Sequence, residues 1–216
     1  MNKVYLESLF SVERMQKYFI LRPGEDAKSI AHYQCNIQMS EAFYPAISTL
    51  EVALRNSVNR ALTRKYGGPD WYVHFPAAAP LAKLVNDINT AKAQISHRRE
   101  PLTPPKIIAE LTLGFWVRLF NTEYERILWK DLRLAFPHLP KPIRQRHTVS
   151  APLNNFRHFR NRIFHHEPIC WNLLRLKTMH DEMITVMGWI NRDLPSWVGP
   201  IDRFDTVLQD VQRRLR

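Results

Sequence analysis

Apolar residues recur every three or four positions along most of the chain, the spacing of one buried face of an α-helix. The pattern is clearest over residues 40–66. Its apolar positions are Phe43, Ile47, Leu50, Leu54, Val58 and Leu62. Ser40 is a suitable N-cap, Pro45 would kink or delay the first turns, and Gly67-Gly68-Pro69 would end the helix. The sequence therefore predicts one long amphipathic helix here.

The same spacing predicts helices along the rest of the chain, and stretches typical of strands are few. The N-terminal part, a helix or helix pair over 1–22 and a short helix over 26–38, is interpreted as core without chemistry. The remaining predicted helices cover 80–96, a segment from Pro104 through Leu119, a segment capped by Asn121 and running to Phe136, and then 148–167, 171–191 and 201–216. We expect a single all-α domain over residues 1–216.

Composition fits this expectation. The chain has 216 residues, 45% of them hydrophobic and 24% charged, which is ordinary for one globular domain. No apolar run is long enough to span a bilayer, so we expect no membrane partner. The two cysteines, Cys35 and Cys170, are too few for a disulfide framework, and we expect both to be buried in a cytoplasmic protein.

Candidate chemistry gathers near the end of the predicted helix 148–167. Arg160, Asn161, His165 and His166 lie within seven consecutive residues. Pro168 disfavours helical backbone at the preceding residue, so the helix should run up to the histidines and stop at Glu167. An arginine can bind phosphate oxygens bidentately, and a histidine can transfer a proton near neutral pH. Together these side chains are sufficient for metal-free attack on a phosphodiester.

Positive charge is concentrated in the same region. The net charge is +11, and residues 141–175 contain seven Lys or Arg against one acid. A basic surface attracts polyanions and gains affinity by releasing their counterions. A solvated basic face without a partner is the alternative, but the overlap with the candidate residues favours nucleic acid, and RNA in particular.

The pattern Arg160-Asn161-x-x-x-His165 resembles the signature of the HEPN superfamily of helical ribonucleases. The longer string Arg-Asn-Arg-Ile-Phe-His-His-Glu-Pro-Ile, residues 160–169, looks more narrowly like the Abi-like (abortive infection) proteins of bacteria. Further similar stretches lie at 40–56 and 111–129. The resemblance implies a HEPN-like helical bundle with additional N- and C-terminal helices. It also implies a homodimer in which two motifs form one composite site.

The mechanism that this resemblance favours is metal-independent RNA cleavage by the ribose 2′-hydroxyl, with no cofactor. His165 would transfer a proton, Arg160 would stabilise charge on the phosphate, and Asn161 would orient one of them. His166 would be a second proton-transfer group or would replace His165. Arg157, Arg162 and Glu167 are candidate supporting or substrate-binding residues. The role implied is phage defence by abortive infection, or growth arrest as a toxin with a possible antitoxin.

Two further residues are expected to support the site. Arg55 and Asn56 repeat the Arg-Asn dipeptide of the motif, and Arg55 stands one helical turn from Glu51, an i, i+4 ion-pair spacing. The resemblance suggests that they act behind the catalytic residues, and a solvated ion pair is the equal alternative.

Other interpretations remain open. Arg160, Asn161 and His165 could be structural partners in a helix end. A metal site from His158, His165, His166 and Glu167 lacks a His-Glu-x-x-His arrangement, and no serine-hydrolase elbow or phosphate-binding glycine loop is present. The main alternative function is a non-catalytic basic helical dimer that binds RNA or a partner protein.

Overall fold

The computed structural model describes residues 2–216, which contain helices and no β-strand. The expected all-α fold class is therefore confirmed. The α-helices are α1 (Lys3–Phe10), α2 (Val12–Phe19), α3 (Asp26–Ala42), α4 (Tyr44–Tyr66), α5 (Ala82–His97), α6 (Pro104–Glu110), α7 (Leu113–Arg118), α8 (Glu125–Leu132), α9 (Arg146–Phe164), α10 (Leu173–Ile190), α11 (Leu194–Val198) and α12 (Phe204–Leu215). Among residues 2–216, none of these helices combines the length and apolar character needed to cross a lipid bilayer.

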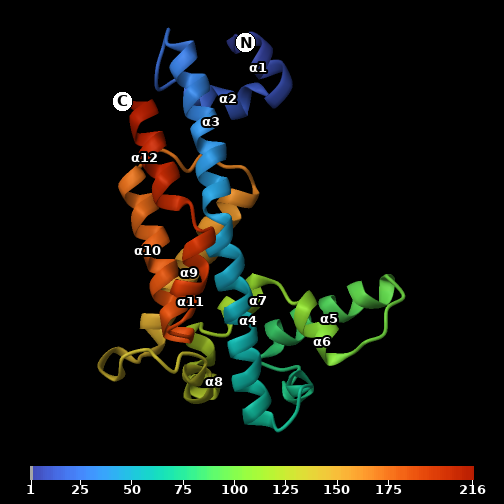
Figure 1. Cartoon of the computed structure of the whole chain (residues 1–216). Helices are drawn as coiled ribbons and strands as arrows, with labels where there is room; N and C mark the ends of the chain where they lie inside the picture. Colours follow the sequence, from blue (N-terminus) through green and yellow to red (C-terminus); the bar gives the residue numbers. More distant parts are fainter. Residues whose placement is uncertain (1) are drawn as a thin grey trace.

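Helices α3 and α4 follow one another almost in line and form the long axis of the molecule (Figure 1). The junction lies at Phe43, because Pro45 is accommodated only in the first turn of a new helix. Ser40 is therefore not the N-cap that the sequence suggested. It lies inside α3, where its hydroxyl donates to the carbonyl of Asn36. The predicted end of α4 is confirmed, with Gly67 in the left-handed conformation at φ 79°.

The C-terminal helices pack along this axis: α12 against α3, and α10 against α4. All six apolar positions predicted on the long helix are buried in the main core. The aromatic residues of α7 and the segment after it, Phe115, Trp116, Phe120 and Tyr124, are also buried in the core and leave no ring free for base stacking. Burial of this continuous apolar face is the principal stabilising contribution to the fold.

The segment that was expected to form one helix from Pro104 to Leu119 is instead two helices. Leu111 has extended backbone at ψ 127°, and Thr112 then caps α7 by accepting from the amide of Phe115. Asn121 was expected to cap the next helix with its side chain, and no such hydrogen bond is present. The following helix also ends early, at Leu132, before a 3₁₀ turn over 133–135.

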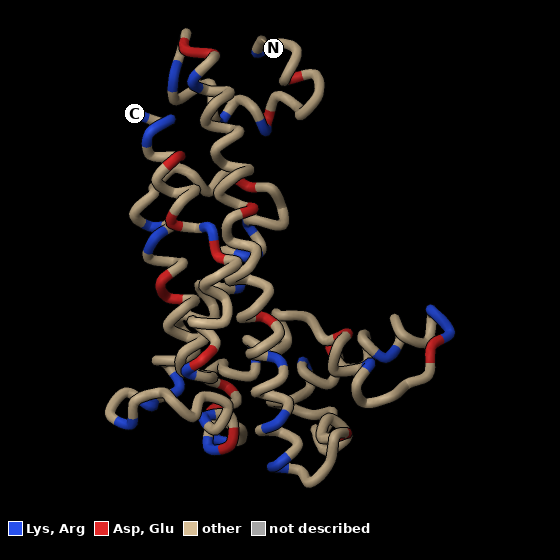
Figure 2. The backbone as a smooth tube through the Cα atoms, in the orientation of Figure 1, with Lys and Arg blue, Asp and Glu red and all other residues tan. Residues whose placement is uncertain are grey.

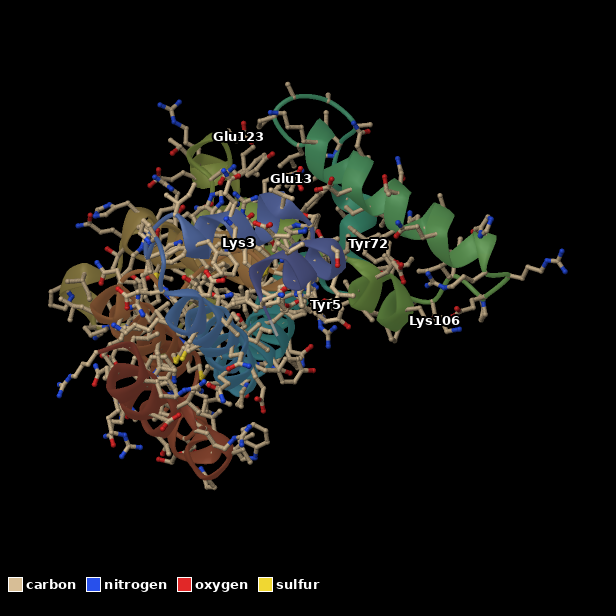
Figure 3. The ribbon with its side chains drawn as sticks, turned by 90° about the horizontal axis from the view of Figure 1, so that it is seen from above. Lys3, Tyr5, Glu13, Tyr72, Lys106 and Glu123 are labelled. Carbon is tan, nitrogen blue, oxygen red and sulfur yellow. The ribbon has the colours of Figure 1, made fainter. Side chains whose placement is uncertain are left out.

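Helices α5 and α6 extend to one side of the bundle, as the view from above makes clear (Figure 3). Their connection is fixed by Arg98, which forms ion pairs with Glu100 and Glu110, while Lys106 pairs with Glu100. At the opposite end of the molecule, α1 and α2 form the helix pair that was one of the two expectations for residues 1–22. They pack on α3 around a small separate apolar cluster of Leu6, Met15 and Phe19.

Phe43 is the point where most of the bundle meets. Its ring lies 4.6 Å from that of Phe159 on α9 and 4.8 Å from that of Phe204 on α12, measured between centroids. His180 of α10 stacks on Phe204 at 4.1 Å, and its Nε2 lies 2.7 Å from the carboxylate of Asp202. The fully buried ring at the α3–α4 junction thus contacts aromatic rings from α9, α10 and α12.

The first prediction concerns this ring. Phe43→Ala should lower the free energy of unfolding by about 3–5 kcal/mol, because it removes a buried aromatic side chain and leaves a cavity between helices. Urea unfolding followed by circular dichroism measures the loss. The neighbouring variant Tyr44→Ala is the control: Tyr44 is exposed, so its replacement should change stability by less than about 0.5 kcal/mol. Equal losses in the two variants would contradict the role given to Phe43.

Candidate functional site

The motif helix α9 ends at Phe164, three residues earlier than the expected stop at Glu167. Pro168 is therefore not what ends it. His165 occupies the C-cap position at φ −87° and ψ 8°, and His166 follows with φ 55° in the left-handed region. The two histidines are part of the turn that closes the helix rather than of the helix itself.

This turn has the hydrogen bonds of a Schellman motif. The amide of Glu167 donates to the carbonyl of Arg162 at 2.8 Å, and that of His166 donates to the carbonyl of Ile163 at 2.9 Å. Glycine is the usual residue at the left-handed position, because a Cβ is unfavourable there. A histidine in this backbone conformation is less favourable than a glycine would be, and the His166 side chain is exposed. Strained backbone of this kind clusters at functional sites.

The backbone after the turn is held by Asn36 on α3. Its side-chain oxygen accepts from the amides of Ile169 at 2.6 Å and Cys170 at 3.1 Å, and its amide nitrogen donates to the carbonyl of Glu167 at 3.3 Å. Asn36 is itself almost completely buried. One carboxamide therefore forms hydrogen bonds with three backbone groups of the loop. Without it, these groups would be buried without hydrogen-bond partners.

Two further side chains attach the same loop to the N-terminal helices. Arg14 of α2 donates to the carbonyl of His166 at 2.6 Å, and His32 of α3 donates from Nε2 to the carbonyl of Cys170 at 2.9 Å. Burial lowers the pKa of His32, because the charged ring would lose its hydration, and the hydrogen bond to Cys170 only partly offsets this. The exposed imidazoles of the motif therefore project from a backbone that is fixed on several sides.

Arg160 lies in a different environment. Its Nε is 3.4 Å from the carboxylate of Glu51 on α4, and its guanidinium lies over the ring of Phe164, 4.2 Å from the centroid. The expected pair between Glu51 and Arg55 is thus replaced by a pair between Glu51 and Arg160. A phosphate bound by this guanidinium would compete with that carboxylate.

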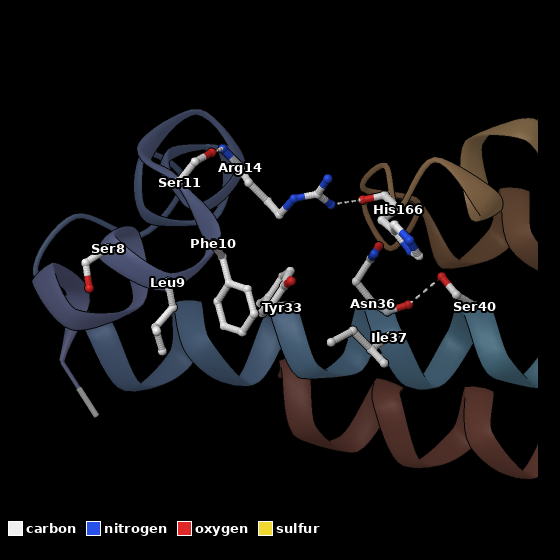
Figure 4. Close-up of a pocket in the computed structure, with 10 residues that line it drawn as sticks. All are labelled: Ser8, Leu9, Phe10, Ser11, Arg14, Tyr33, Asn36, Ile37, Ser40 and His166. Atoms are coloured by element: carbon white, nitrogen blue, oxygen red, sulfur yellow. Dashed lines mark hydrogen bonds between the residues drawn. The ribbon is translucent and has the colours of Figure 1, made fainter.

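The histidines line hollows on the other side of the turn. His165 and His166 border a hollow of about 210 Å³, whose charged lining is mixed: Arg14 and Lys17 of α2, and Glu13 and Glu167. His166 also borders a larger hollow between α1, α2 and α3 (Figure 4). Arg160 and Asn161 line neither of them. Within one chain the structure brings the two histidines together, but it does not bring Arg160 into the same hollow.

The other residues predicted around the motif have structural contacts. Arg162 donates to the carboxylate of Glu167 at 3.2 Å and to the carbonyl of Pro168, which braces the turn. Arg157 contacts the ring of the adjacent His158, and its Nε is buried without a hydrogen-bond partner among residues 2–216. Asn161 is half-buried in the last turn, and its backbone carbonyl accepts from the amide of His165.

Arg55 and Asn56 lie on α4 away from the histidines. Arg55 donates to the side chain of Asn56, and both line a hollow of about 220 Å³ closed by Pro104 and Pro105 of α6. No hydrogen bond joins either residue to the motif within residues 2–216. Their nearest link is indirect, because Glu51, one turn earlier on α4, holds Arg160.

The basic character of residues 141–175 is partly absorbed by the fold. Arg144 donates to the carbonyls of Pro137 and Leu139, and Arg146 pairs with Glu125 and donates to the carbonyl of Phe120. Lys and Arg are spread over most elements with acidic residues between them (Figure 2). Much of the local charge excess is thus used to hold loops, and a smaller part remains for a ligand.

The arrangement of the potential metal ligands and of the two thiols bears on two other kinds of site chemistry. Among residues 2–216, no group of three or more His, Cys, Asp or Glu side chains is placed to hold a metal ion. Both cysteines are buried, as expected, and burial together with the neighbouring Cys35 raises the pKa of the Cys170 thiol to about 12. The thiol therefore stays protonated near neutral pH, which makes it a poor nucleophile.

Sequence reasoning missed the contribution of the N-terminal helices, which it had interpreted as core only. Arg14, His32 and Asn36 contact a loop more than 130 residues away along the chain. The only local signal was polarity on the apolar side of α3, where His32 and Asn36 are buried beside Cys35 and Met39. Such a signal indicates a buried partner but does not identify it.

A second prediction tests the carboxamide. Asn36→Ala should strand the buried amides of Ile169 and Cys170, and each unsatisfied donor costs about 1–3 kcal/mol. The free energy of unfolding should therefore fall by about 2 kcal/mol or more in urea titrations. Gln38→Ala, on the exposed side of the same helix, should change it by less than about 0.5 kcal/mol. A neutral Asn36→Ala would show that these hydrogen bonds do not stabilise the loop.

A third prediction follows from the lowered pKa of His32. In the unfolded chain histidine binds a proton near pH 6.5, whereas the buried ring resists protonation. The unfolded state then binds more protons, so stability should fall as pH drops through and below about 6.5. His32→Gln should lose less stability than wild type between pH 7 and pH 5, and His97→Gln, at an exposed position, should behave as wild type. Equal pH dependence in wild type and His32→Gln would reject this assignment.

Comparisons with known proteins add no family assignment. No protein-family model, no curated protein and no solved structure matches this chain. The resemblance to HEPN and Abi-like proteins therefore rests on the motif and on the similar stretches at 40–56 and 111–129 alone.

Proposed function

We propose that the chain is a metal-independent endoribonuclease in which the imidazoles of His165 and His166 transfer protons during attack of a ribose 2′-hydroxyl. The observation that carries the proposal is the pair of exposed imidazoles on a backbone that Arg14 and Asn36 hold in place. Catalytic groups need such fixed positions, because misplacement of the reacting groups is costly in rate.

Arg160 would supply positive charge to the phosphate in the transition state. Because it lies apart from the histidines of its own chain, a composite site built by two chains is the arrangement that we favour. In such a homodimer, Arg160 of one protomer could meet the phosphate held near the histidines of the other. RNA binding would require the phosphate to displace Glu51 from the guanidinium.

One observation favours a second candidate, a basic helical module that binds RNA without cutting it. Arg160 is already paired with Glu51, and Arg162 is used to brace the turn. A structural role for these arginines would leave the surface charge to bind a polyanion. The two proposals differ in whether any single imidazole is required. A role in abortive infection or as a toxin, with or without an antitoxin, would follow from the enzyme.

A fourth prediction distinguishes them. Purified wild type, incubated with mixed cellular RNA in EDTA, should produce fragments with cyclic phosphate ends, and DNA should stay intact because it lacks the 2′-hydroxyl. His165→Ala and Arg160→Ala should reduce the cleavage rate at least 100-fold, in the range typical of a lost proton-transfer group. His166 should be replaced by glycine, which suits its left-handed backbone and so removes only the ring.

His147→Ala is the matched control, since His147 is an exposed histidine at the other end of α9. It should cleave as wild type does. RNA binding by all variants without cleavage by any would support the binding module. Equal cleavage by all variants would indicate a different site or a contaminating nuclease, and the assignment of these residues would be wrong.

A further inference from the structure

The larger hollow beside His166 has the size and lining of a ligand site. Its volume is about 800 Å³, within the range of small-molecule pockets. Figure 4 shows its boundaries, with Phe10 and Leu9 from α1, Arg14 from α2, and Tyr33, Ile37 and Ser40 from α3. The ring of His166 closes the end that is nearest the motif.

The walls of this hollow expose apolar side chains that the fold leaves uncovered. Leu9 is 55% exposed, Phe10 42% and Ile37 54%. Phe10 lies outside the small apolar cluster below it, and its ring is tilted at 51° to that of Tyr33, with centroids 5.5 Å apart. A planar aromatic ligand could stack on such a surface with little rearrangement.

Polar groups lie at the same hollow. Ser40 uses its proton on the carbonyl of Asn36, so its oxygen can still accept a hydrogen bond. Arg14 spans the gap between α2 and the motif turn, with one nitrogen on the carbonyl of His166. The hollow therefore combines an apolar surface with a hydrogen-bond acceptor and a positive charge. A flat ligand that has hydrogen-bonding edges and a negatively charged group attached to it suits these features better than a purely apolar ligand.

We propose that this hollow binds one unpaired nucleobase of a single-stranded RNA, stacked on Phe10, next to the phosphate that lies at the histidines. The proposal rests on the proposed function for the position of that phosphate. It is supported by continuity, because His166 borders both this hollow and the smaller one, which His165, Arg14 and Lys17 line together with the acids Glu13 and Glu167. The net charge of +11 favours a polyanion over an apolar segment of another protein.

An unpaired base is specified because bases in an RNA helix are stacked and cannot enter such a hollow, whereas single-stranded bases can be turned out onto aromatic side chains. The predicted substrate class is thus RNA loops and single strands. Duplex RNA would have to open before a base could reach Phe10.

The test measures binding and not cleavage, so that it can fail independently of the proposed function. The probe is a short single-stranded 2′-O-methyl RNA, which cannot be cut by its own 2′-hydroxyl, and fluorescence anisotropy gives its affinity for the full chain. Phe10→Leu, which keeps an apolar side chain but removes the ring, should weaken binding about tenfold. Phe10→Trp should retain affinity. Tyr5→Leu is the control, since Tyr5 is an exposed aromatic on the same helix that does not line the hollow.

A second arm uses probes with one base removed at successive positions. One position should reproduce the loss caused by Phe10→Leu, and combining the two changes should cost no more than either alone, because both remove the same contact. Unchanged affinity in Phe10→Leu, additive losses, or no binding of the probe by wild type would overturn the proposal. The last result would favour a protein segment as occupant. Base stacking without any cleavage in the earlier assay would retain this subsite and reject the enzyme.

Discussion

The side-chain amide of Asn36 is the interaction on which the geometry of the candidate site depends. It satisfies three backbone groups of the loop that follows α9, and it does so from a buried position on α3. Loss of these bonds would leave buried donors without partners, which is costly in a medium of low dielectric constant. Because the loop begins at the histidine turn, the bonds that anchor it to α3 also fix where the imidazoles project.

The turn itself combines stabilising and strained features. A Schellman motif closes the helix, and the ion pair between Arg162 and Glu167 lies across it. His166 nevertheless stands where glycine is usual, and Arg14 holds its carbonyl from another helix. The tertiary contacts thus offset a local preference against this residue. This places two exposed imidazoles at the smaller hollow, and His166 also at the larger one, whereas Arg160 is turned toward α4.

This separation affects how the motif should be understood. Arg160 lies on α9 and is held by Glu51 of α4, whereas His165 lies in the closing turn and borders the hollow beside α2. In the proposed homodimer, Arg160 of one protomer would lie near the histidines of the other, which would bring together the groups that are separate within one chain. Glu51 would then act as a local competitor for the guanidinium. RNA affinity would depend on how readily a phosphate replaces that carboxylate.

The sequence by itself determined the all-α class, the apolar face of α4 and the Gly67 helix end, because hydrophobic spacing and backbone preference are local properties. It also located the motif. Tertiary structure decided the rest: α9 ends at Phe164 through bonds that involve the loop, and Glu51 pairs with Arg160 rather than with Arg55. The hollow beside His166 was equally inaccessible to sequence reasoning. It is formed where α1 and α2 pack on α3 next to a turn more than 120 residues later in the chain, and no local pattern encodes such a long-range contact.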